Sequence, residues 1–330
     1  MAVNTLITGG AGFIGSHLAQ LLKEQGCHVI LVDDMSTGRR ENISHLLDSR
    51  CELVEAPASE ALKKDPSLLD GVQHVYHLAA SVGVRLVAAD PAAIIRNNVA
   101  ETQVLLTAAA HCDAILVASS SEVYGRTARL PMSEDDDLVF GATSSSRWCY
   151  GISKALAEHL SFAYHARPGA SVVVVRLFNT IGPRQIGHYG MVVPRFVERA
   201  VAGQALPIYG SGQQTRAFCD VRDVVRAMTE LMNSPVHHGQ VYNVGSDHAL
   251  TIDELADQVI ALAGSSSTKR YIPFEQAYQP GFEDIAQRVA DLSKIQRAIG
   301  FEPRYTLDQT VGELISLAND LQTSVAGGRG

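Results

Sequence analysis

Cysteines are few in this sequence of 330 residues, and they follow no pattern. There are five of them, an odd number, and no two are spaced as Cys-x-x-Cys. Neither a disulfide framework nor a cysteine zinc site is therefore indicated, and reduced thiols in the cytoplasm are expected.

Long apolar runs are absent as well. No stretch approaches the roughly 18 apolar residues that a membrane-spanning helix requires. Residues 3–8 already have the character of a β-strand, which leaves no room for a signal peptide. We expect a cytoplasmic protein with no membrane partner.

The sequence also lacks an excess of basic charge. Its formal net charge is -8, and no block of Lys and Arg interrupts it, so a nucleic-acid partner is not expected. His237 and His238 fall in an expected surface loop with no other ligand nearby in sequence, so we interpret them as solvated and predict no metal. With 46% hydrophobic and 19% charged residues, the chain is expected to be globular.

Short β-branched runs alternate with longer helical patterns in the first half of the chain. Strands are expected at residues 3–8, 28–33, 72–79, 114–119 and 171–178. Between them, residues 14–25, 92–111 and 150–166 carry apolar side chains at three- and four-residue spacing, as helices that cover a sheet do. This alternation predicts an α/β fold with a doubly wound parallel sheet of the Rossmann type.

After Asn179 the pattern loosens into stretches punctuated by Gly and Pro, mixed with short helices. Residues 215–232 and 241–245 look like a helix and a strand that return to the main sheet. We therefore expect a dinucleotide-binding domain at 1–178 plus about 215–245, and a smaller, discontinuous C-terminal lobe for the substrate at about 179–214 and 246–330.

Three glycines, Gly9, Gly12 and Gly15, lie between the first expected strand and the first helix. In that position glycines permit a tight turn and a close approach of pyrophosphate to the backbone, and the helix N-terminus supplies N–H groups. Asp33 and Asp34 end the second strand, where a carboxylate can bind ribose hydroxyls and repel a 2′-phosphate, so NAD is preferred over NADP. The alternative is that both are turn residues.

Tyr150 and Lys154 form a Tyr-x-x-x-Lys pair, which places a phenol and an ammonium one helical turn apart. Ser120 follows the preceding strand, at the sheet edge where ligands bind. Beside an oxidised nicotinamide, Lys154 is expected to lower the pKa of Tyr150 so that the phenolate accepts a proton from a substrate hydroxyl that Ser120 orients.

Five segments (TGGAGFIGSH, HLAA, SSSEVYG, YGISK and RLFNTIGPRQ) together resemble the NAD-dependent epimerase/dehydratase family of nucleotide-sugar enzymes, within the extended short-chain dehydrogenase/reductases, over nearly the whole chain. The resemblance implies an NAD site and a nucleotide-sugar site. The residues implied at the NAD site, beyond those named above, are Phe13, Ile14, Ser36, Thr37, Gly38, Leu78, Ala79, Ala80 and Asn98. Those implied for a UDP-sugar are Arg85, Asn179, Val192, Tyr209, Arg216 and Arg288.

Within the family, the segment YGSGQQTRAF and an arginine three residues before the tyrosine, Arg147, resemble UDP-glucuronate decarboxylases. Glu122 and Arg288 resemble catalytic positions of related decarboxylases. Ser121 stands where sugar dehydratases carry an aspartic acid, which disfavours a dehydratase. The loop at 81–87 instead resembles the Gly-Val-Arg loop of uronate 4-epimerases.

The resemblance leaves the roles of several residues open. Arg147 could pair with the acidic stretch 134–137, and Arg288 with Asp291 or Glu283. Arg216 could be a solvated charge and Asn179 a turn cap. Glu122 is either the proton carrier at sugar C5, directly or through a water, or a support for other residues.

Three functions follow as hypotheses. The first is an NDP-glucuronate decarboxylase, a lyase that oxidises sugar C4, releases CO₂ and restores C4. The second is a UDP-hexose or UDP-hexuronate 4-epimerase, an isomerase with the same Tyr150 and Lys154. The third is a non-catalytic NAD sensor, which the Tyr-x-x-x-Lys pair disfavours. Helices 92–111 and 150–166 resemble those that pair across a two-fold axis in the family, so a homodimer is expected.

Overall fold

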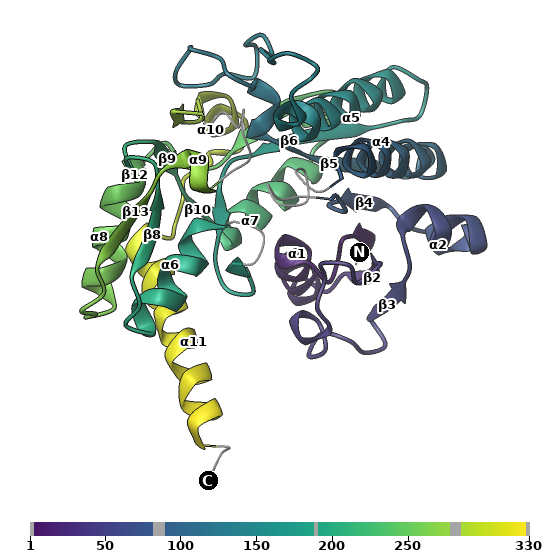
Figure 1. Ribbon diagram of the computed structural model, residues 1–330. Coiled ribbons are helices and arrows are strands. Elements are labelled where there is room, and N and C mark those ends of the chain that lie inside the picture. Colours follow the sequence, from purple (N-terminus) through teal and green to yellow (C-terminus); the bar gives the residue numbers. More distant parts are fainter. Residues whose placement is uncertain (1–2, 82–89, 188–190, 278–284, 328–330) are drawn as a thin grey trace.

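A computed structural model describes residues 3–81, 90–187, 191–277 and 285–327. Its centre is a parallel sheet of seven strands in the order β11-β6-β5-β4-β1-β2-β3 (Figure 1). The strands are β1 (Asn4–Thr8), β2 (His28–Asp33), β3 (Cys51–Glu55), β4 (His74–His77), β5 (Ala114–Ser120), β6 (Val172–Leu177) and β11 (Val241–Val244). From β1 the chain winds outward in both directions, so the expected doubly wound fold is confirmed.

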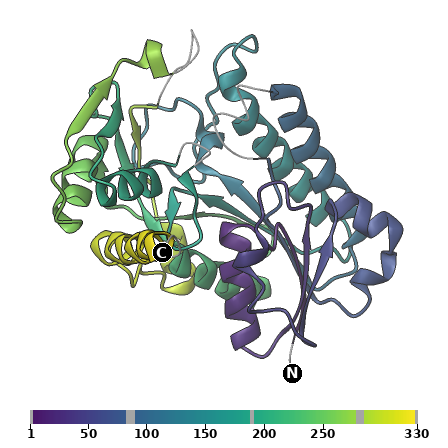
Figure 2. The same ribbon diagram turned by 60° about the horizontal axis from the view of Figure 1, so that its bottom comes forward.

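Helices cover both faces of this sheet. One face carries α1 (Phe13–Glu24), α7 (Val221–Met232) and α10 (Ser293–Ile299). The other carries α2 (Ala58–Lys64), α4 (Pro91–Ala108) and α5 (Cys149–His165). Figure 2 shows the two helical layers with the sheet between them.

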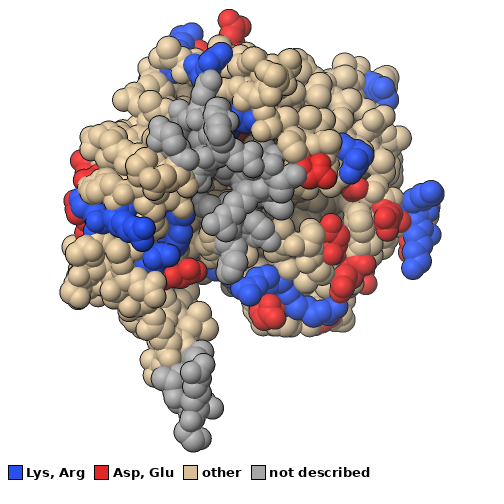
Figure 3. All heavy atoms as spheres, viewed as in Figure 1, with Lys and Arg blue, Asp and Glu red and all other residues tan. Residues whose placement is uncertain are grey.

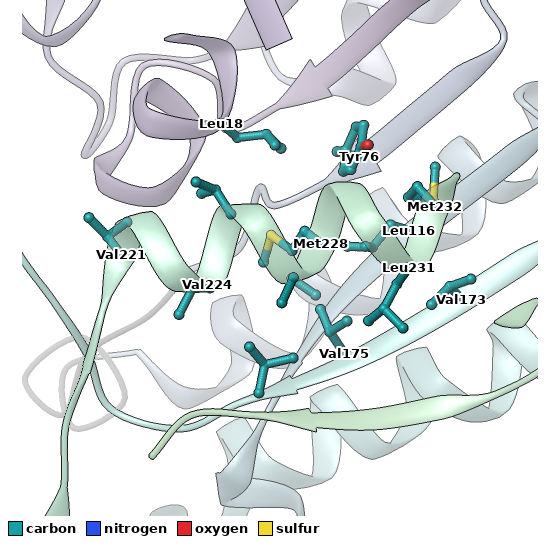
Figure 4. Packing of buried hydrophobic residues seen from close by; sticks show 14 of the residues in the cluster. Leu18, Tyr76, Leu116, Val173, Val175, Val221, Val224, Met228, Leu231 and Met232 are labelled. Atoms are coloured by element: carbon teal, nitrogen blue, oxygen red, sulfur yellow. The ribbon is translucent and has the colours of Figure 1, made fainter. Parts of the chain in front are cut away.

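Neighbouring residues of each strand serve opposite cores, as the two-residue period of a strand requires. Leu6 belongs to the core under α2 and α4, whereas Ile7 belongs to the core under α1 and α7. Figure 4 shows the core under α1 and α7, in which Val224, Met228 and Leu231 of α7 pack against the sheet. Burying a side chain of this size stabilises the fold by about 1.5–3 kcal/mol, so α7 is fixed to the sheet by several such contributions.

The C-terminal part of the chain packs around a third apolar core, which includes Phe196, Ile208 and Leu255. Its helices are α6 (Val192–Val201), α8 (Ile252–Leu262), the short α9 (Phe274–Ala277) and α11 (Leu307–Gly327). Its strands are β8 (Leu206–Tyr209) paired with β13 (Lys269–Ile272), and β9 (Thr215–Ala217) between β12 (Ala249–Thr251) and β14 (Gln287–Arg288). A two-stranded connection, β7 (Thr180–Ile181) with β10 (Cys219–Asp220), lies between this part and the main sheet.

Two local expectations were wrong. The helix expected from residue 215 begins at Val221, because residues 215–217 pair with β12 and β14 and the Asp220 carboxylate caps the helix by accepting the Arg222 N–H. His237 is not solvated: it is buried, and its ring hydrogen-bonds the Tyr242 hydroxyl at 3.1 Å.

On the face shown in Figure 3, basic and acidic side chains of the described residues are interspersed. Within the described ranges, no helix combines the length and apolar character needed to cross a membrane.

Candidate functional site

A cavity of about 1260 Å³ opens at the carboxyl ends of the central strands, where the main sheet meets the C-terminal part of the chain. It exceeds the roughly 300–1,000 Å³ typical of a pocket for one small ligand, so it has room for a dinucleotide and a second ligand side by side. Of the expected site residues that the structure describes, all except Gly38 line it. The lining residues among those expected are Gly9, Gly12, Phe13, Ile14, Gly15, Asp33, Asp34, Ser36, Thr37, Leu78, Ala79, Ala80, Asn98, Ser120, Ser121, Glu122, Arg147, Tyr150, Lys154, Asn179, Val192, Tyr209, Arg216 and Arg288. Arg85 and the Gly-Val-Arg loop lie outside the described residues.

The three glycines of the first turn do different things. Gly9 has a φ of +70°, and a Cβ on it would lie 2.8 Å from the backbone of Ala79. A Cβ on Gly15 would lie 2.1 Å from the Gly9 carbonyl oxygen, so Gly15 permits α1 to pack against its own turn. A Cβ on Gly12 would meet only the Gly9 oxygen, at 3.1 Å. Gly12 therefore leaves open the space beside the N-terminus of α1, which suits a dinucleotide pyrophosphate.

Asp33 lies in the cavity with its carboxylate held by backbone donors. It accepts the N–H of Ala11 at 3.0 Å and that of Met35 at 2.9 Å. Burial raises the pKa of Asp33, and the two N–H groups act against this. Gly38 does not line the cavity. It packs against Asp33, since a Cβ on Gly38 would lie 2.5 Å from an Asp33 carboxylate oxygen. The glycine therefore contributes by leaving room for Asp33.

Asn98 lines the cavity, but other parts of the protein occupy its amide. Its oxygen accepts the Ser81 N–H at 2.9 Å, and its nitrogen donates to the Ser153 hydroxyl at 3.0 Å. It thus ties the end of β4 to α5, the helix that carries Tyr150 and Lys154.

Tyr150 and Lys154 both reach the cavity from the first turns of α5. The Tyr150 phenol is hydrogen-bonded to the Ser120 hydroxyl. Burial nevertheless raises the pKa of Tyr150, so the expected lowering is not produced by the chain's own groups. Lys154 donates to the Ala118 carbonyl at 2.8 Å, and burial lowers its pKa to about 8. The positive charge of a bound, oxidised nicotinamide would lower the pKa of Tyr150.

Glu122 is clamped between two arginines. Arg147 donates to one carboxylate oxygen and Arg288 to the other, each at 2.6 Å. Burial would raise the pKa of Glu122, but the charges of Arg288 and Arg147 lower it to about 2. Arg147 and Arg288 each form an ion pair with Glu122, a partner that the sequence did not suggest for either of them. Glu283, one of the partners considered for Arg288, lies outside the described residues. Ser121 is buried beside them, with its hydroxyl 3.5 Å from an Arg288 nitrogen.

At the far end of the cavity, the expected substrate residues meet others that sequence reasoning missed. Arg195 of α6 stacks over the Tyr209 ring at 4.7 Å and donates to its hydroxyl at 2.9 Å. Asn179 donates to the Ala217 carbonyl, and Arg216 to that of Thr215. Arg195 lies three residues after Val192, one turn along the same helix, and this spacing was the available signal. The other lining residues that were missed include Ser144, Ser145, Ser146, Arg184 and Gln185.

The described residues contain no group of three or more His, Cys, Asp or Glu placed to hold a metal ion. The cavity is thus equipped with a glycine turn for pyrophosphate, a phenol and an ammonium for proton transfer, and two arginines suited to anionic groups.

Residues 5–245 match the NAD dependent epimerase/dehydratase family. Over 325 residues the chain is 38% identical to a UDP-N-acetyl-alpha-D-glucosaminuronate decarboxylase of Bacillus cytotoxicus, covering 98% of this chain and 99% of that protein. It is 35% identical over 314 residues to UDP-glucuronic acid decarboxylase 1 of Danio rerio, covering 94% of this chain and 71% of that protein. A solved structure of UDP-glucuronic acid 4-epimerase from Bacillus cereus, with UDP-glucuronic acid and NAD, is 31% identical with a TM-score of 0.85, covering 97% of this chain and 100% of that one. The chain therefore belongs to the NAD-dependent epimerase/dehydratase family and is an enzyme of that family with NAD as its cofactor.

Proposed function

We propose that this enzyme decarboxylates a UDP-hexuronate, with UDP-glucuronate as the first substrate to test. The observation that carries the proposal is the Glu122 carboxylate fixed between Arg147 and Arg288 in the NAD cavity. Two buried guanidinium groups beside Tyr150 suit a substrate with a carboxylate near its reacting carbon. The names of the two decarboxylases cited above support the same reaction.

The glycine turn and its neighbours hold the cofactor in this proposal. Gly9, Gly12, Phe13, Ile14 and Gly15 receive the pyrophosphate, and Asp33, Asp34, Ser36 and Thr37 the adenosine ribose. Leu78, Ala79 and Ala80 line the path to the nicotinamide, with Tyr150 and Lys154 beside it. When bound, NAD takes up hydride from sugar C4 and later returns it.

The chain's own groups manage the proton and the carboxylate. Tyr150 accepts the C4 hydroxyl proton, and Ser120 holds that oxygen in line by a hydrogen bond. The resulting C4 ketone is β to the C6 carboxylate and takes the electron pair that CO₂ leaves behind. At neutral pH a carboxyl with a pKa of about 2 stays ionised. We therefore assign Glu122 to positioning the two arginines, and a water molecule to supplying the proton that C5 takes up after CO₂ has left.

Arg288 has the donor that this step needs. Its side chain is buried, and two of its nitrogens face Glu122 and Ser121. Among the described residues, its Nε has no hydrogen-bond partner. A buried N–H without a partner costs about 1–3 kcal/mol, and a substrate carboxylate or phosphate oxygen would satisfy it. Asn179, Val192, Tyr209 and Arg216 are assigned to the rest of the nucleotide sugar.

A UDP-hexuronate 4-epimerase is the second candidate. It would use the same Tyr150, Lys154 and Ser120, and the solved Bacillus cereus epimerase favours it. In that case the keto sugar rotates within the cavity before C4 is reduced on its other face.

Incubating the enzyme with NAD and UDP-glucuronate separates the two. Release of CO₂ with a UDP-pentose product supports decarboxylation, and UDP-galacturonate as the product supports epimerisation. UDP-N-acetylglucosaminuronate in parallel tests which group is accepted at C2. Turnover undiminished in Tyr150→Phe would contradict the assignment of the proton acceptor.

We further propose a homodimer built on α4 and α5, and a cytoplasmic location. The two helices pack side by side, and Val104 and Leu156 on them are 38% and 43% exposed, which is high for apolar side chains. All five cysteines are free thiols, which fits a reducing compartment. Light scattering on the purified protein tests the dimer.

A further inference from the structure

A buried ion pair joins α5, the helix of Tyr150 and Lys154, to β6 outside the cavity. Glu158 of α5 and Arg176 of β6 are 4% and 5% exposed, and neither lines the cavity. Arg176 donates to the Glu158 carboxylate through Nη2 at 2.8 Å and Nε at 3.0 Å. A buried ion pair of this kind adds little net stability to the fold, because the cost of desolvating both charges offsets much of their attraction. Its position near Lys154 and Ser120 indicates a role in the reaction instead.

Glu158 connects the two elements that carry the polar groups assisting Tyr150, Lys154 and Ser120. It lies four residues after Lys154, so the two side chains share one face of α5. Its Oε1 also accepts the hydroxyl of Ser119, the residue before Ser120 at the end of β5. One carboxylate thus connects the helix that presents Lys154 with the strand that presents Ser120.

The same pair continues toward Arg288. Arg176 donates to the Glu134 carbonyl at 3.2 Å, and the Glu134 carboxylate accepts the Asn243 N–H at 2.7 Å. The Asn243 side chain donates to the carbonyls of Met132 and Asp291. Asp291 lies three residues after Arg288, so the network reaches the segment that carries the second arginine of the site.

Among the described groups around Lys154, Glu158 is the one whose negative charge favours the protonated, charged form of the lysine. From β4, His77 faces it, but burial lowers the His77 pKa to about 3, so that ring is neutral. From α4, Asn98 and Thr102 are uncharged, and from β6 Arg176 is held by Glu158 itself. Burial lowers the pKa of Lys154, and the Glu158 charge acts against it.

We propose that Glu158, held by Arg176, is a positioning residue that keeps Lys154 charged and Ser120 in place for proton transfer by Tyr150. The inference rests on the proposed function, because it assumes that Lys154 and Ser120 serve that reaction. Glu158 touches neither cofactor nor substrate in this scheme. It acts through its charge on Lys154 and through Ser119, the residue before Ser120.

The test compares Glu158→Gln with a matched variant, Asp220→Asn. Asp220 is also buried and also accepts two hydrogen bonds from an arginine, Arg222, and one from a hydroxyl, that of Thr310, but it does not line the cavity. Both variants remove one buried negative charge and keep the side-chain shape. Both are expected to unfold at a lower temperature than the parent.

The first readout is the pKa of Lys154, which is measured by ¹³C NMR of the NAD-loaded enzyme labelled at lysine Cε. The chain has six lysines, and Lys154→Met assigns the signal. Glu158→Gln is expected to lower the Lys154 pKa by about one pH unit, whereas Asp220→Asn leaves it in place. An unchanged Lys154 titration in Glu158→Gln overturns the proposal, and a shift of equal size in both variants does the same.

The second readout is the pH profile of kcat on the substrate that the parent enzyme turns over. Glu158→Gln is expected to reduce kcat about fivefold near pH 8, with KM changed less than twofold and the basic limb moved to lower pH. A lower melting temperature with an unmoved profile indicates a merely structural role and overturns the proposal. Should Glu158→Gln not fold, Glu158→Gln with Arg176→Met removes both charges and is judged by the same two readouts.

The NMR titration needs no substrate. If the parent enzyme leaves both UDP-glucuronate and UDP-N-acetylglucosaminuronate unchanged, the proposed function fails while the Lys154 result still decides the role of Glu158.

Discussion

Replacing Glu122 with glutamine tests the charge arrangement at the centre of the site. The change keeps the shape of the side chain and an oxygen that can accept a hydrogen bond. It removes the negative charge between Arg147 and Arg288, whose side chains are 11% and 9% exposed. Two buried cations then face each other across a neutral amide, so we expect the folded state to be destabilised.

The magnitude follows from the pKa of Glu122, which the two arginines lower from 4.5 to about 2. That lowering corresponds to about 3 kcal/mol of stability at neutral pH. Because the folded-state pKa is the lower one, the stabilisation is complete well above pH 4.5 and is lost as the pH falls toward 2. By pH 3, roughly 2 of the 3 kcal/mol are gone.

Urea unfolding of the parent and of Glu122→Gln, each at pH 7 and at pH 3.5, measures both parts of this expectation. The variant should be less stable by about 3 kcal/mol at pH 7, and the difference should shrink at the lower pH. Equal stability at pH 7, or a difference that does not depend on pH, would refute the reasoning. Glu60→Gln, on the first turn of α2, is a suitable control for the removal of a carboxylate, because the Glu60 side chain is exposed to solvent.

Three further predictions concern the cofactor, the subunit contact and metals. Gly12→Ala places a methyl group beside the expected pyrophosphate, so NAD affinity measured by calorimetry should fall about tenfold with little change in melting temperature, whereas Gly15→Ala, whose Cβ would lie 2.1 Å from the Gly9 oxygen, should unfold earlier. Leu156→Glu puts a charge on the exposed face of α5 and should give a monomer by light scattering, and a parent that is already monomeric contradicts the proposed dimer. EDTA should leave turnover unchanged, and an activity that only an added divalent ion restores would overturn the expectation of a metal-free enzyme.

The fold could be predicted from the first half of the sequence because its local signals agree with the tertiary arrangement. Buried parallel strands appear as short β-branched runs, and each helix shows its apolar stripe. The failures came where local sequence underdetermines the result. Residues 215–217 form a strand because β12 and β14 lie on either side of them, and His237 is buried because the chain folds it onto Tyr242.

The site was predictable as a set of residues but not as a set of contacts. The sequence identified Glu122, Arg147 and Arg288 separately, and two of their suggested partners were neighbours in sequence. Their ion pairs join residues that are 25 and 166 positions apart, which no local pattern encodes. Glu158 and Arg176 were not identified, since a glutamate on a helix and an arginine on a strand usually indicate solvated charges.

The charge of the Glu122, Arg147 and Arg288 group bears on which reaction the cavity favours. With Glu122 ionised the three side chains carry one net positive charge, which a substrate carboxylate would neutralise. Two positive charges without Glu122 would bind that carboxylate more strongly before reaction, and binding of the ground state alone raises the barrier to losing CO₂. An epimerase gains from a carboxylate that is firmly held, whereas a decarboxylase must let it leave. An ionised Glu122 weakens the hold of the arginines on the carboxylate, and this is the physical reason to place decarboxylation ahead of epimerisation.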